Sequence, residues 1–122
     1  MCDFDLAWNT FSFHAAECSK LEDSHFKDIN DLNNLILNNP DLRSLNKKRI
    51  KKELLLDTNS LLTAYKKQMD AIDDLIDLNK EGKIPKDLEI DMEYLFSLKN
   101  ITATLSEELK ASVSRLLECL SE

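Results

Sequence analysis

The sequence predicts an all-α fold, an elongated antiparallel bundle of three long amphipathic helices with coiled-coil-like packing. The 122-residue chain contains one Gly and two Pro, the commonest turn residues, so few turns are available. Sheets need many turns, because strands average about 5–6 residues. Apolar residues instead recur every three or four positions, the spacing of one helix face. We therefore expect a single helical domain over residues 1–122.

The first predicted helix covers about residues 3–38, a stretch without Gly or Pro. Phe13, Phe26 and Leu35 lie off its main apolar stripe, which predicts a broad face that contacts two neighbouring helices. Ser24 is a good helix cap, so the helix could break there and form two shorter ones. The main stripe consists of Phe4, Trp8, Phe11, Ala15, Cys18, Leu21, His25, Ile29, Leu32 and Ile36.

The second predicted helix covers about residues 40–80 and follows a clear stop signal. Asn39 can cap its N-terminus, with Pro40 at the first helical position. The apolar period breaks near residues 47–49, and residues 57–60 combine poor helix formers with good caps. We expect a kink or short break at one of these two places. Such breaks would divide the bundle into four or five helices.

The third predicted helix covers about residues 87–120. Gly82 fits the position just past the end of the second helix, and Pro85 follows in the loop. Acidic residues crowd residues 87–93, the sign that a helix N-terminus favours. The apolar stripe is the most regular in the chain and contains Leu88, Met92, Leu95, Thr102, Leu105, Leu109, Val113, Leu116 and Leu120.

Charge and cysteine usage limit the partners and the compartment. The formal net charge is -7, so the chain repels phosphate backbones and anionic lipids, and we expect no direct nucleic-acid binding. The three cysteines have no metal-binding spacing and indicate a reducing compartment, the nucleus or cytoplasm. No apolar run reaches the roughly 20 residues of a membrane-spanning helix.

No constellation in the sequence is complete enough for catalysis. His14 and Cys18 share a helix face, but His25 lies about 16 Å further along the axis, too far for the same ion. Four aspartates form an acidic helix face without the glycine or spacing of a calcium loop. We therefore expect no enzyme, no cofactor, no metal and no small-molecule substrate. The four aspartates are Asp70, Asp73, Asp74 and Asp77.

One basic patch interrupts the acidic chain. Residues 40–58 contain six basic and three acidic side chains, a local charge of +3. A run of this kind is typical of nuclear import signals and of anion-binding patches, although it is also common at the solvated start of a helix. It could also dock an acidic partner. The patch consists of Lys47, Lys48, Arg49, Lys51 and Lys52.

These patterns predict a non-enzymatic structural or adaptor subunit that assembles with other helical proteins. The alternatives are a homo-oligomeric coiled-coil protein and a small regulatory effector that binds a partner through an apolar groove. The architecture is similar to spectrin-type repeats and to the regulatory domains of syntaxins, a likeness of helix pattern that implies a fold and no particular activity. The predicted partner-binding residues are Phe4, Trp8, Phe11, Leu95, Leu105, Leu109, Val113, Leu116 and Leu120.

Overall fold

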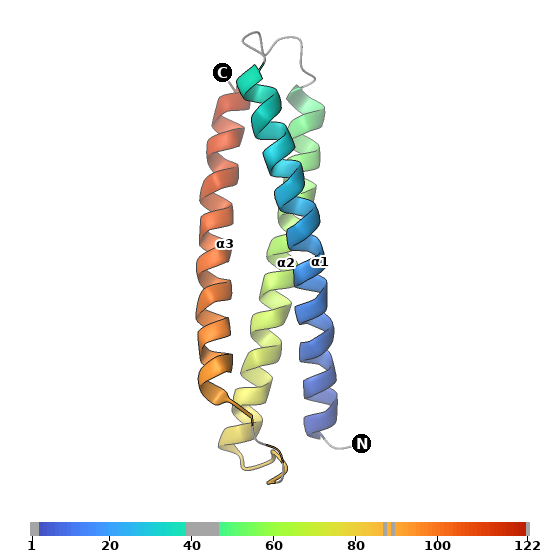
Figure 1. Cartoon of the computed structure of the whole chain (residues 1–122), viewed down its shortest axis with the longest axis vertical. Helices are drawn as coiled ribbons and strands as arrows, with labels where there is room; N and C mark the ends of the chain where they lie inside the picture. The colour runs from blue at the N-terminus through green and yellow to red at the C-terminus, as the bar shows by residue number, and fades with distance from the viewer. Residues whose placement is uncertain (1–2, 39–46, 87, 89, 122) are drawn as a thin grey trace.

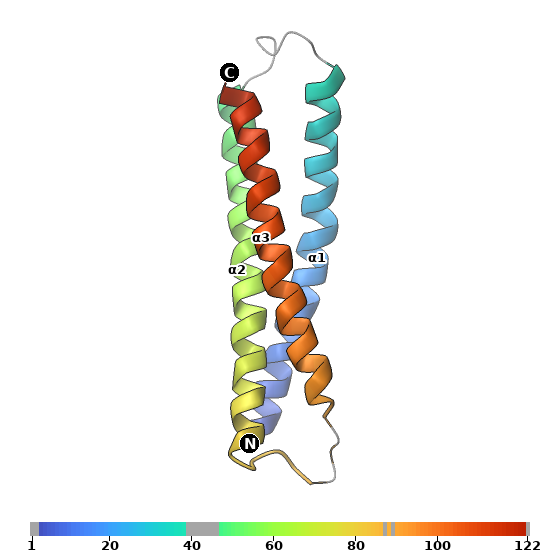
Figure 2. The same cartoon turned by 90° about the vertical axis from the view of Figure 1, so that its left-hand side faces the viewer.

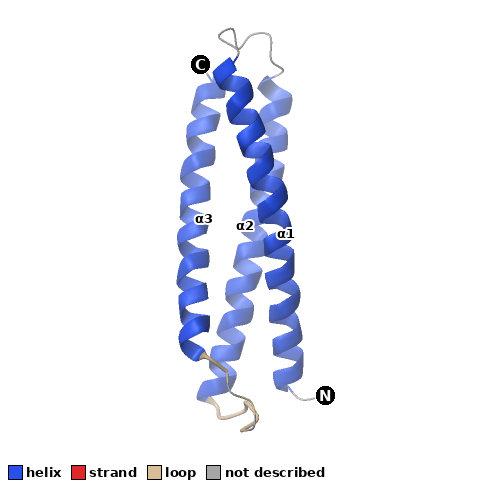
Figure 3. Ribbon diagram, viewed as in Figure 1, coloured by secondary structure: helices blue, strands red, loops and turns tan. Residues whose placement is uncertain are grey.

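The computed structural model describes residues 3–38, 47–86, 88 and 90–121. Helices α1 (Asp3–Asn38), α2 (Lys47–Lys80) and α3 (Met92–Ser121) run up, down and up in an elongated bundle (Figure 1). Colouring by secondary structure shows the helices and the loop between α2 and α3, without a strand in the described part of the chain (Figure 3). The predicted all-α three-helix bundle is confirmed.

Helix α2 is the central element, because both other helices pack closely against it while α1 and α3 approach each other much less. The view at right angles shows α1 and α3 lying along different sides of α2 (Figure 2). Seven of the ten buried residues of α2 repeat every seven positions in two series, the pattern of coiled-coil packing. The two series are Leu54, Leu61, Gln68 and Leu75, and Thr58, Tyr65 and Ile72.

A buried polar layer lies between two apolar clusters of the core. The Nε2 atom of Gln68 donates a hydrogen bond to Thr102 Oγ1 at 2.9 Å. The Thr102 hydroxyl donates to the carbonyl of Leu98 at 2.7 Å, and Ser106 Oγ donates to the carbonyl of Thr102 at 3.0 Å. The bond from Gln68 ties α2 to α3 in one register, and the other two satisfy the buried hydroxyls of Thr102 and Ser106 within α3. We call the two clusters the lower and the upper cluster, after their places in Figure 1 relative to this layer. The lower cluster contains Phe4, Phe11, Ala71, Ile72, Leu75, Ile76 and Leu95. The upper cluster contains Cys18, Leu54, Leu61, Ala64, Tyr65, Leu109 and Val113.

The helix breaks expected at Ser24 and at residues 57–60 do not occur. Helix α1 continues through Ser24, and α2 continues through residues 57–60. Thr58 and Ser60 donate their hydroxyl protons to the carbonyls four residues earlier, at 2.6 and 2.9 Å. This back-bonding satisfies the hydroxyls within the helix, so their preference for caps does not stop it. The helix start predicted at Asn39 and Pro40 lies outside the described residues.

The third helix begins later than expected, at Met92 rather than near residue 87. The Oδ1 atom of Asp91 accepts a hydrogen bond from the backbone N–H of Tyr94 at 3.1 Å, so Asp91 is the N-cap. Ile84 and Ile90 in the preceding loop pack against the lower cluster, which holds this segment outside the helix. Of the acidic residues in the described part of this segment, Asp91 precedes the helix and Glu93 lies in its first turn. Their charge alone did not locate the helix start.

Gly82 ends α2 as the sequence predicts. Its φ is 69°, in the left-handed region where glycine avoids a side-chain penalty. The N–H of Gly82 bonds to the carbonyl of Asn79 at 3.1 Å, and that of Lys83 to the carbonyl of Leu78 at 2.9 Å. This pair of bonds is a Schellman motif, which satisfies carbonyls that the helix leaves unpaired.

We expect Asp91→Ala to lower the free energy of unfolding by about 1 kcal/mol, because it removes the acceptor that caps α3. Urea denaturation followed by circular dichroism measures this change. Asp91→Asn is the control, because an asparagine side chain caps nearly as well. Equal losses in both variants would show that the carboxylate charge, and not the cap, matters at this position.

Two leucines of α2 provide a matched test of the core. Leu61 is fully buried, whereas Leu56 is 58% exposed. We expect Leu61→Ala to lower the free energy of unfolding by about 2–5 kcal/mol through lost burial and a new cavity, and Leu56→Ala by less than about 0.5 kcal/mol. Thermal and urea unfolding of both variants check the difference. Similar losses would contradict the burial of α2 described above.

Candidate functional site

Most of the predicted partner-binding residues lie inside the bundle. The intramolecular core buries or half-buries eight of the nine, so the fold itself accounts for their apolar character. Their contact with a partner stays a prediction. The eight are Phe4, Phe11, Leu95, Leu105, Leu109, Val113, Leu116 and Leu120.

Trp8 is the exposed member of the set, with 40% of its surface accessible. Its ring lies between two core phenylalanines, with centroids 6.2 Å from Phe4 and 5.6 Å from Phe11. Trp8 therefore covers the outer side of the lower cluster near the start of α1. It contributes apolar surface at one end of the bundle without forming a pocket of its own.

Cys18, one of the groups considered for chemistry, is buried in the upper cluster. Burial, with help from Glu22 and Glu17, raises the pKa of the Cys18 thiol to about 11, so this thiol is a poor nucleophile and metal ligand near neutral pH. Within the described ranges, no three His, Cys, Asp or Glu side chains are grouped so that they could hold a metal ion. Nearby, Tyr65 donates its hydroxyl proton to Glu22 at 2.7 Å, which links α1 to α2. Cys18 and Tyr65 thus belong to the same cluster of packed side chains between α1 and α2.

The four aspartates of the acidic face predicted on α2 lie in different surroundings. Asp73 pairs with Lys99 of α3 at 2.5 Å, a half-exposed ion pair between the two helices. Asp74 and Asp77 instead line a groove on the α1 side of the helix. Asp70 is exposed. The four aspartates therefore do not converge on one site.

His25 is the one buried side chain with unsatisfied polar atoms in the described part of the chain. It is 3% exposed, and neither ring nitrogen has a hydrogen-bond partner. Burial lowers the pKa of His25 from 6.5, an effect that Asp57 of α2 and Asp28 of α1 oppose. Burial and a hydrogen bond with Asp28 raise the pKa of Asp57. The neutral imidazole is therefore favoured in the folded chain.

The basic patch forms the first turns of α2. Lys48 and Lys52 are exposed, and the Nε atom of Arg49 lies 3.1 Å from Glu53 Oε1. Lys47 and Lys51 are partly buried. The patch is thus a solvated helix start with a local ion pair, and its role as an import signal stays a prediction.

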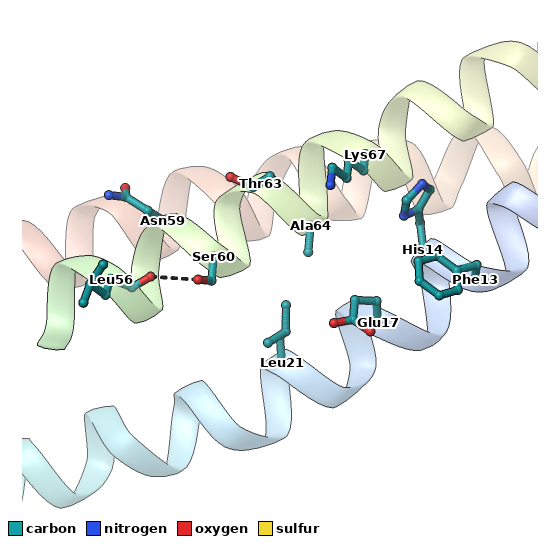
Figure 4. Close-up of a pocket in the computed structure, with 10 residues that line it drawn as sticks. All are labelled: Phe13, His14, Glu17, Leu21, Leu56, Asn59, Ser60, Thr63, Ala64 and Lys67. Carbon is teal, nitrogen blue, oxygen red and sulfur yellow. Dashed lines mark hydrogen bonds between the residues drawn. The ribbon is translucent and has the colours of Figure 1, made fainter.

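A long groove runs between α1 and α2, and we call it the α1/α2 groove. Three consecutive hollows of about 380, 530 and 470 Å³ make it up, and only residues of these two helices line them. In the middle hollow, Leu21 of α1 and Ala64 of α2 point toward each other across the gap (Figure 4). Within each hollow the α1 lining residues recur at helical spacing, and the last of the middle hollow, Leu21, is seven residues, about two turns, from the first of the upper hollow, Asp28. The three hollows therefore follow one face of the helix.

Large apolar side chains stand exposed along this groove. Leu6 in the lower hollow is 59% exposed, and in the middle hollow Phe13 is 64% and Leu56 58% exposed. These residues were not predicted as a site. The available signal was their position off the core stripes, which for Phe13 was visible in the sequence. Single exposed apolar residues are ordinary, but three along one groove mark a candidate docking surface.

No protein-family model, curated protein or solved structure matches the chain. None of the described helices combines the length and the apolar character needed to cross a bilayer. The α1/α2 groove therefore has to be interpreted from its own geometry and chemistry.

We expect the stability of the chain to fall between pH 7.5 and 5. In this range the unfolded chain takes up a proton at His25 near pH 6.5, whereas the folded chain resists it because burial lowers the pKa of His25. Asp57 acts in the opposite sense at lower pH, because its raised pKa makes the folded state take up a proton first. Replacing His25 with leucine should reduce the fall and add about 1 kcal/mol at pH 7, since unsatisfied polar atoms leave the core.

Urea denaturation at several pH values tests this expectation, with His14→Leu as the control. His14 is the other histidine of the chain and is only partly buried, at the edge of the α1/α2 groove. We expect His14→Leu to keep a fall in stability over this range, because His25 and its lowered pKa remain. An unchanged pH dependence in His25→Leu would contradict the burial of a neutral imidazole.

Proposed function

We propose that this chain is a non-enzymatic structural or adaptor subunit that binds a helix of another protein in the α1/α2 groove. The observation that supports this proposal is the row formed by Leu6, Phe13 and Leu56, which are exposed and line one groove. Other large apolar side chains are also exposed, among them Tyr94, Phe96 and Ile101 on α3, but they do not line this groove. The fold itself does not need the side chains of this row. Covering them would remove apolar surface from water, the main favourable term in protein association.

The shape of the groove suits a helix. From Asp3 to Leu35 the α1 side spans 32 residue steps, or about 50 Å. A helix about 20 residues long covers about 30 Å of this length. The hollows are open and lined by mixed polar and apolar side chains, unlike the enclosed apolar pockets that hold small molecules. An amphipathic helix lying in the groove would bury its apolar face against both α1 and α2.

The same groove supports a second candidate, a small regulatory effector that is stable alone and binds its target reversibly. The complete core of the single chain favours this alternative, because a stable monomer needs no partner to fold. We also place the protein in the nucleus or cytoplasm as a proposal. The thiols of Cys18 and Cys119 are unpaired, in keeping with a reducing compartment.

Site-specific photocrosslinking in cells of the source organism tests the docking role. We expect a benzoylphenylalanine at position 13 or at position 56 to trap the same protein, because both positions line the middle hollow. The trapped product is identified by mass spectrometry. A partner that also co-purifies with the chain without crosslinking would support the complex subunit. A partner that is recovered only when crosslinked would support the effector.

Asn100 provides the control position, since it is exposed on α3 and does not line the groove. Trapping of the same protein at position 100 with equal yield would contradict docking in the groove. A product of twice 14.1 kDa that contains only this chain would indicate the homo-oligomer instead.

A further inference from the structure

We propose that the α1/α2 groove selects a lysine- or arginine-rich amphipathic helix of a partner protein. This inference rests on the proposed docking function and adds the chemistry of the occupant. It follows from the charges that line the groove, which are almost all of one sign. The apolar row and the charged edges belong to the same surface, so one helix can satisfy both.

The groove carries eight carboxylates and one lysine. Three of the carboxylates line the lower hollow, one the middle hollow and four the upper hollow. The lysine is Lys67, in the middle hollow opposite Glu17. The carboxylates are Asp3, Asp74 and Asp77 below, Glu17 in the middle, and Asp28, Asp31, Glu53 and Asp57 above.

The two ends of the groove are therefore acidic, although at the upper end Arg49 pairs with Glu53 and the pKa of Asp57 is raised, which reduces the negative charge there. The middle is nearly neutral and apolar. A partner helix whose apolar stripe covers Phe13 and Leu56 would place its flanking residues along the two acidic ends. Basic residues there would meet opposite charge, whereas acidic residues would meet like charge and be rejected. Arginine and lysine also have long apolar stems that can lie along a groove edge while their charges remain near water.

A second copy of the chain fits this surface poorly. Its net charge is -7, and the groove edges of two copies would repel each other. Its basic patch is confined to the first turns of α2, and Arg49 there already pairs with Glu53 of the same helix. The long charge complement that the groove requires must therefore come from another polypeptide.

Binding of designed helical peptides to the full chain tests the inference. The probe is a fluorescein-labelled peptide of about 21 residues with leucines on one face and lysines on the other, compared with a peptide that carries glutamates in place of the lysines. Fluorescence anisotropy should show binding of the lysine peptide at least about tenfold tighter than that of the glutamate peptide, with the difference shrinking at high salt. A third peptide of scrambled order and equal charge should bind about tenfold more weakly than the lysine peptide, because it lacks the apolar face.

Matched charge reversals locate the binding. We expect the combined variant Asp31→Lys, Asp74→Lys and Asp77→Lys to weaken binding of the lysine peptide at least about tenfold. These three carboxylates are exposed, and each of them lines the groove. The control changes the same total charge on α3, outside the groove, and should alter binding less than about threefold. The control variant combines Glu107→Lys, Glu108→Lys and Glu118→Lys, which are also exposed.

Equal losses in the two triple variants would overturn the inference, because attraction would then reflect net charge alone. Tighter binding of the glutamate peptide would overturn it as well. The docking function itself fails separately, when photocrosslinks at positions 13 and 56 are absent in a folded chain. If those crosslinks form and persist in the groove triple variant, docking stands and the basic partner is rejected.

Discussion

The bundle depends on the seven-residue repeat of α2, because this helix buries one broad face against both of its neighbours. Leu61, Ile72 and Leu75 are fully buried along this face, and Tyr65 is nearly so. The hydrogen bond from Gln68 to Thr102 sits between the apolar clusters and fixes how α2 and α3 match along their lengths. Sliding either helix by one turn would leave the Gln68 amide buried without its partner, because the Thr102 hydroxyl bonds within α3 in either position. The polar layer therefore specifies one alignment where leucine contacts alone would accept several.

The same arrangement determines where the groove forms. Since α1 contacts the core through the stripe that contains Phe4, Phe11 and Cys18, the residues about a quarter to a half turn away face outward beside α2. Leu6 and Phe13 occupy such positions, and no third helix covers that side. The groove is therefore a consequence of packing α1 and α3 against different sides of α2. The sequence can vary the side chains that line it without changing this arrangement.

The helix count, the helix order and most of the core follow from apolar spacing, because three long stripes with few breakers admit few other folds. The start of α3 could not be located in this way, because acidic residues suit a loop and a first helical turn equally. Capping by Asp91 depends on local backbone geometry. The continuity of α2 through Thr58 was missed because cap-forming side chains can also bond back within a helix.

The candidate site was missed for a different reason. An apolar stripe does not reveal whether the chain's own helices cover it. Leu109 and Val113, predicted to contact a partner, are buried within the bundle, and their contact with a partner stays a prediction.

The distribution of charge separates what holds this fold together from what recognises a partner. The core uses few ionised groups, and its one unsatisfied polar side chain, His25, is favoured in the neutral form. Most of the groove carboxylates are solvated at its edges, where each contributes little to stability. Because they are solvated, these carboxylates can be placed along the groove without disturbing the packing of the core. Their summed electrostatic field repels acidic chains and attracts basic ones. Apolar contact with Phe13 and Leu56 would supply affinity but little discrimination, because many amphipathic helices can cover a leucine and a phenylalanine. The carboxylates would supply the discrimination, so the apolar middle and the acidic ends have distinct and complementary roles in choosing the helix that binds.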